Sequence, residues 1–100
     1  MKAETTPFDP AEYLDVEEDQ IDLLRDAFAS GDAAYIANAI GVVARARNVS
    51  KLARETGLTR AGLYKAFSSE GDPKLSTVVG VLDALGFKLS VEATAPRPTA

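Results

Sequence analysis

Apolar residues recur every three or four positions in three stretches of the chain, the spacing that puts them on one face of an α-helix. The first stretch covers residues 17–30 and ends at Gly31, the second follows Asp32 and runs to about Arg47, and the third covers residues 75–85 and ends at Gly86. Three amphipathic helices are therefore predicted. Their apolar faces comprise Ile21, Leu24 and Phe28, then Ile36, Ala39, Ile40, Val43 and Ala44, then Leu75, Val78, Val79, Leu82 and Leu85.

Two shorter helices are predicted between the second and third stretches. Ser50 is expected to cap a helix that runs to about Thr56, where Gly57 ends it. Thr59 is expected to cap another helix that runs to about Phe67, before the polar segment SSEGDP.

After Gly86 the helical period gives way to alternation. Phe87, Leu89 and Val91 alternate with polar residues, which predicts one half-buried strand over 87–92. Unpaired backbone groups are costly, so we expect these three dimer-strand residues to pair with the same strand of a second copy in a two-fold homodimer. The alternative is an extended tail that lies on the helices of its own chain.

The expected organisation is one mainly α domain over residues 9–93, with about five helices and one strand. Asp9 and Pro10 predict a short turn through about Leu14, residues 1–8 are expected to form a flexible arm, and the Pro-rich residues 94–100 a disordered tail. One hundred residues suffice for one core but not for a two-lobed enzyme with a deep cleft.

Composition argues against catalysis. The chain has no Cys and no His, which removes disulfides, thiolate zinc sites and the usual acid/base residue. It also lacks a phosphate-cradling Gly-rich loop, so no enzyme activity, cofactor or metal is expected, although a Ser nucleophile with a Lys base stays open. The N-terminus lacks the apolar run of a signal peptide and no segment is apolar enough to span a membrane, so a cytoplasmic location is expected.

Charge is unevenly distributed along this chain of net charge −4. Residues 1–32 hold ten acidic and two basic residues, whereas residues 45–74 hold seven basic and three acidic ones. The acidic cluster lacks the spacing of an EF-hand, so a solvated first helical turn is favoured over a metal site, and attraction to a basic partner is a third option. The cluster comprises Asp15, Glu17, Glu18, Asp19 and Asp22.

The basic region centres on the segment VSKLARETGLTRAGLYKAF, residues 49–67. Ala53 is small where two helices would cross, and Gly57 suits the turn between them. The apolar residues Leu52, Leu58, Leu63 and Phe67 are expected to point inward. That leaves the second helix with an outward face of Arg60, Ala61, Tyr64 and Lys65, with Thr59 at its phosphate-attracting N-terminus.

This outward face is typical of a DNA-recognition helix. Arg60 is the best candidate for bidentate contact with a guanine in the major groove, and Ala61 suits a thymine methyl group. Tyr64 and Lys65, one turn further on, are candidates for a base edge or a phosphate. Phosphate contacts at the starts of the flanking helices are assigned to Ser50, Lys51 and Lys74.

The residues Ser50 to Arg54, Gly57 to Arg60 and Leu63 to Phe67, followed by GDPKLSTVVGVLDALG, resemble the Xre/Cro-type helix-turn-helix. More narrowly, with the upstream DPAEYLD, they resemble the antidote proteins of HigBA-like addiction modules. The resemblance implies an antitoxin that neutralises a RelE/HigB-like mRNA-cleaving toxin and represses its own operon as a dimer on a palindromic operator. Gly62 departs from a good recognition helix, since a mid-helix glycine costs about 1 kcal/mol relative to alanine.

Two other classes share these features. A stand-alone prophage-type transcriptional repressor would keep every DNA contact but have no toxin partner. A helical module that binds only proteins would show no salt-dependent affinity for DNA.

Overall fold

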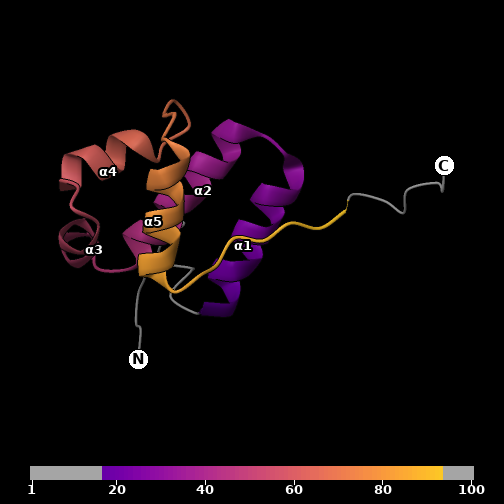
Figure 1. Cartoon of the computed structure of the whole chain (residues 1–100), viewed down its shortest axis with the longest axis horizontal. Helices are drawn as coiled ribbons and strands as arrows, with labels where there is room; N and C mark the ends of the chain where they lie inside the picture. Colours follow the sequence, from indigo (N-terminus) through magenta and orange to yellow (C-terminus); the bar gives the residue numbers. More distant parts are fainter. Residues whose placement is uncertain (1–16, 94–100) are drawn as a thin grey trace, which may run out of the picture.

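The computed structural model describes residues 17–93, and this range contains five helices (Figure 1). They are α1 (Glu17–Ser30), α2 (Ala33–Ala46), α3 (Val49–Thr56), α4 (Arg60–Ala66) and α5 (Leu75–Leu85). The mainly helical class and the positions of all five helices are confirmed. The predicted arm, the turn near residue 10 and the tail from residue 94 lie outside the described residues. Within the described range, no helix combines the length and apolarity needed to cross a membrane.

Helix α2 is the central element, because α1, α3 and α4 all pack against it. The predicted face of Ala39, Ile40 and Val43 is buried, and Gly41 and Val42 are buried as well. A methyl group at Gly41 would overlap the carbonyl oxygen of Phe67. The glycine therefore lets the end of α4 lie directly on the α2 backbone.

The predicted caps set the end of α1, the start of α2 and the end of α5. The Asp32 carboxylate accepts a hydrogen bond from the Ala34 amide at 3.0 Å, which starts α2. Gly31 and Gly86 end α1 and α5 with φ of 72° and 94°, in the left-handed region that glycine adopts without strain.

Arg47, which follows α2, joins three helices at one end of the molecule. Its Nε donates to Gln20 Oε1 of α1 at 2.9 Å, and its Nη1 donates to the Leu85 carbonyl of α5 at 3.2 Å. Its guanidinium also lies 5.7 Å from the centroid of the Phe87 ring. Gln20 is only 2% exposed, so Arg47 satisfies an amide oxygen that has lost its contact with water.

A second polar contact joins α1 to α2. Tyr35 Oη donates to Asp26 Oδ2 at 2.6 Å. This hydrogen bond raises the pKa of Tyr35 above its usual value, with lesser contributions from burial and from the charge of Asp26. Because the phenol must be protonated to donate, the contact is present at neutral pH and is lost as the pH rises through the raised pKa.

The buried face of α5 differs from the predicted one. Val81 is fully buried together with Leu82 and Leu85, whereas Leu75 is 72% and Val79 is 46% exposed. The apolar stripe of this helix is wider than the surface that α3 and the common core offer it. Packing therefore selects one side of the stripe and leaves the other uncovered.

No strand is present between residues 17 and 93. Phe87 and Leu89 are half-buried against the core of their own chain, whereas Val91 is 96% exposed. Phe87 donates its amide to the Leu82 carbonyl at 2.8 Å, but in the described part of the chain residues 88–93 make no backbone hydrogen bond. The segment thus lies on its own helices with an open edge, and pairing across a dimer stays a prediction.

We expect Arg47→Ala to lower the free energy of unfolding by about 1–3 kcal/mol, because it removes the hydrogen bonds that Arg47 donates to the buried Gln20 oxygen and to the Leu85 carbonyl. Urea titration followed by circular dichroism measures this change. Arg45→Ala, which removes an exposed arginine near the end of the same helix, is the matched control and should change stability by less than about 0.5 kcal/mol. Equal losses from the two variants would contradict a role for the Arg47 contacts.

Candidate nucleic-acid interface

Helices α3 and α4 are two short helices joined by residues 57–59. Gly57 ends α3 in the left-handed region, with φ of 77°, and the amide of Leu58 donates to the Ala53 carbonyl at 3.1 Å. Thr59 then caps α4, because its Oγ1 accepts the Gly62 amide at 2.9 Å. The turn and the Thr59 cap are as predicted.

The cap of α3 was predicted wrongly. Asn48, not Ser50, is the N-cap, and its Oδ1 accepts the Lys51 amide at 3.0 Å. The cap therefore lies two residues earlier than predicted. Asn and Ser are both preferred N-cap residues, so the preference alone does not choose between positions 48 and 50. Ser50 is therefore an exposed residue of the first turn, with its hydroxyl outside the cap.

The inward side of this unit is apolar. Leu52, Ala53, Leu63 and Phe67 are buried, as predicted, while Leu58 is only half-buried. Leu63 and Phe67 are four residues apart, so both lie on one side of α4. This packing fixes which residues of α4 face outward.

The outward side of α4 carries the predicted recognition residues. Arg60, Ala61 and Lys65 are exposed, and Tyr64 is 41% exposed. Thr59 is also exposed, at the start of the helix, although its hydroxyl is engaged in the cap. Four side chains of different chemistry, including two cations, are thus presented by less than two turns of helix.

The three flanking residues are exposed but belong to different elements. Ser50 and Lys51 lie in the first turn of α3, and Lys74 is the N-cap residue of α5, although its side chain makes no capping hydrogen bond. Lys51 Nζ lies 3.8 Å from Glu55 Oε2, and because both side chains are largely exposed this ion pair is weak and can open.

Not every basic residue of the region faces solvent. Arg47 contributes to the positive balance of residues 45–74, yet it bonds within the fold and is only partly exposed. Sequence reasoning missed this role, because no local pattern links Arg47 to Gln20, 27 positions away. Arg54, which is exposed on α3, keeps its charge at the surface.

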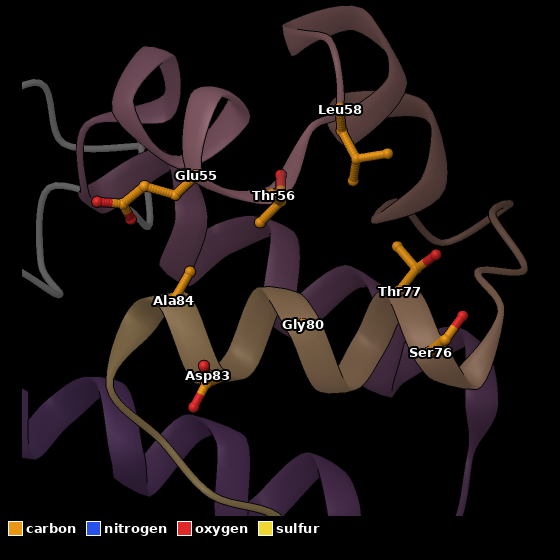
Figure 2. Close-up of a pocket in the computed structure, with 8 residues that line it drawn as sticks. All are labelled: Glu55, Thr56, Leu58, Ser76, Thr77, Gly80, Asp83 and Ala84. Atoms are coloured by element: carbon orange, nitrogen blue, oxygen red, sulfur yellow. The ribbon is translucent and has the colours of Figure 1, made fainter.

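A groove of about 600 Å³ lies between α3 and α5 (Figure 2). Apart from Leu58, its side chains are small or acidic, with Glu55 on α3 and Asp83 on α5, so it does not suit phosphate. Among residues 17–93, no three carboxylates converge as metal ligands. The groove is lined by Glu55, Thr56, Leu58, Ser76, Thr77, Gly80, Asp83 and Ala84.

Comparison with known proteins places the chain in a family. Residues 4–93 match a family model described as "Probable addiction module antidote protein". A Haemophilus influenzae protein described as "Uncharacterized protein" is 39% identical over 92 residues, which cover 92% of this chain and 95% of the relative. No solved structure matches the chain. The chain therefore belongs to the family of probable addiction module antidote proteins.

Proposed function

We propose that this protein is the antitoxin of a type II toxin-antitoxin module, which neutralises a RelE/HigB-like mRNA-cleaving toxin by binding it and represses its own operon by binding DNA. Membership of an antidote family implies a toxin partner and a regulatory, non-enzymatic role. The observation that carries the DNA-binding half is the outward face of α4, held at a fixed angle by its buried side.

The geometry of α4 supports major-groove binding. The buried Leu63 and Phe67 seat the helix on the core, and Gly41 lets its end approach α2 closely. The exposed Arg60 stands at the N-terminal end of α4, the end that enters the groove in helix-turn-helix proteins. In this arrangement Arg60 donates to guanine O6 and N7 and specifies the sequence.

The remaining candidates hold the duplex in register. Lys65 and Tyr64 contact a base edge or phosphate one turn beyond Arg60, and Ala61 meets a thymine methyl. Ser50 and Lys51 from α3, with Lys74 before α5, contact the backbone. The amide groups at the start of α4 add to these contacts once Thr59 turns toward phosphate.

A homodimer places two such surfaces on a palindromic operator. The segment 87–92 has an open backbone edge within the described chain, and Phe87 and Leu89 already hold it against the core. Antiparallel pairing of this segment with its copy would give its free backbone N–H and C=O groups hydrogen-bond partners and would help to bury the exposed Val91. The two recognition helices then lie about 34 Å apart, one turn of DNA, or a multiple of it.

The acidic side of α1 suits a partner other than DNA. Glu17, Glu18 and Asp19 form its first turn and are exposed. In Figure 1, α1 lies on the opposite side of the molecule from α3 and α4. Its negative charge is thus kept away from the proposed DNA surface and is available to steer a basic RNA-binding toxin.

We expect Arg60→Ala to weaken binding to the DNA upstream of the protein's own gene by about 1–3 kcal/mol while leaving affinity for scrambled DNA nearly unchanged. Lys51→Ala should weaken both and reduce the slope of log K against log salt by about 1. Fluorescence anisotropy over a salt series measures these effects. Arg25→Ala, an exposed arginine on α1, is the charge-matched control and should alter neither.

Wild-type protein that binds the two DNAs equally at low salt would rule out the recognition-helix assignment. A loss in Arg25→Ala as large as that in Arg60→Ala would show a diffuse charge effect and not a base contact.

Toxin neutralisation is tested with the protein encoded by the adjacent reading frame, which we expect to be the toxin and to arrest growth when expressed alone. Co-expression of the antitoxin should restore growth, and the two proteins should co-purify. Arg60→Ala should retain neutralisation while it loses repression of a reporter, because separate surfaces serve the two partners. Repression without any neutralised neighbour would instead identify a stand-alone repressor.

A further inference from the structure

Helix α5 exposes an apolar face. Leu75 is 72% exposed and Val79, four residues on, is 46% exposed, so the two side chains lie on one side of the helix. Ser76 and Gly80 are exposed beside them, and Asp83 carries the charge at the far end of this face. We call these five residues, Leu75, Ser76, Val79, Gly80 and Asp83, the α5 face.

Gly80 is unexplained by the packing of its own chain. It lies in the interior of α5, where glycine weakens a helix, yet a Cβ built there would meet nothing within 4 Å. Within the described residues, therefore, neither the backbone angle nor a neighbour requires glycine. A mid-helix glycine at an open surface is typical of a site where another backbone approaches closely.

The segment that follows α5 leaves the end of this helix as an extended stretch. In Figure 1, α5 and residues 87–93 both run along the near side of the molecule. A two-stranded ribbon alone is marginal in water, and a specific interface buries about 800 Å² on each partner. A ribbon of about six residues from each chain is small against that area, and α5, which directly precedes the segment, exposes the apolar residues Leu75 and Val79.

We propose that a second copy of this chain docks on the α5 face, so that two α5 helices cross antiparallel near Val79 and Gly80. This inference rests on the dimer of the proposed function and adds the surface that completes it. In an antiparallel pair centred on Val79, Asp83 of each copy lies near the positive helix start of the other. The face is thus complementary to itself in charge.

The same contact orients the DNA surfaces. Helix α5 packs directly against α3, so a two-fold axis through the α5 pair relates the two α3–α4 units by a short rigid path. Flexing of the 87–92 ribbon alone would leave their separation loosely defined. The α5 contact fixes the spacing that a palindromic operator requires.

Sedimentation equilibrium on the full chain tests the proposal with Leu75→Glu and Gly80→Leu. Both variants suit the isolated fold, since Glu is favourable in the first turn of a helix and leucine is a good helix former with open space at residue 80. We expect each to raise the dimer dissociation constant at least tenfold while the circular dichroism spectrum is unchanged. Asn38→Glu, at an exposed position in the interior of α2, is the control and should dimerise like wild type.

Crosslinking gives a second readout, because the chain has no cysteine. Val79→Cys places one thiol beside the proposed axis, where a short bismaleimide should join two copies. Ala29→Cys, exposed on α1, should stay uncrosslinked under the same conditions.

Wild type that remains monomeric, or unchanged dimerisation in both Leu75→Glu and Gly80→Leu, would overturn the proposal, even if the wild type binds its operator. If these variants keep the dimer but no longer co-purify with toxin, the face belongs to the toxin and the proposal also fails. Loss of dimer in the variants supports it even when wild type shows no operator preference, an outcome that would reject the proposed function alone.

Discussion

The hydrogen bonds of one arginine hold three helices in place around the apolar core. Arg47 reaches Gln20 on α1 and the Leu85 carbonyl at the end of α5, and it stacks near Phe87. These contacts meet where α1 begins and where α2 and α5 end, so they set how α1 and α5 lie relative to the central helix. The tight contact between Gly41 and the Phe67 carbonyl does the same for α4. The Arg47 hydrogen bonds thus help to position α1 and α5, and the close contact at Gly41 helps to position α4.

Local rules in the sequence sufficed for much of this structure. Helical periodicity predicted the long helices. Gly57 and Thr59 predicted the turn between α3 and α4, because Gly57 ends one helix in the left-handed region and Thr59 caps the next. The cap of α3 was missed because Asn48 and Ser50 both satisfy the same local rule. The buried side of α5 was misjudged because periodicity marks an apolar stripe but not which part of it finds a neighbour. Val81 and Val79 are only two residues apart, yet one is fully buried and the other half exposed.

The candidate site was predictable to the extent that it is local. The outward side of α4 follows from the inward side, and the buried Leu63 and Phe67 leave Arg60, Ala61 and Lys65 in solvent. The acidic α1 and the basic α3–α4 unit occupy opposite sides of one small domain (Figure 1). An acidic chain can therefore hold an anionic ligand, because charge acts over distances comparable with the Debye length, about 8 Å at physiological salt. Net charge averages over two surfaces that lie on opposite sides of the domain (Figure 1).

The inward turn of Arg47 also affects how ions take part in binding. Each cation that neutralises a phosphate releases condensed counterions from the duplex, and the salt dependence of affinity counts these cations alone. In the proposed DNA complex Arg47 is not among these cations, because it is partly buried and already hydrogen-bonded. Lys51 must first leave Glu55, which partly offsets its gain. The number of ions released on binding DNA is therefore expected to be smaller than the number of basic residues in residues 45–74, because it depends on which of these side chains are free at the surface.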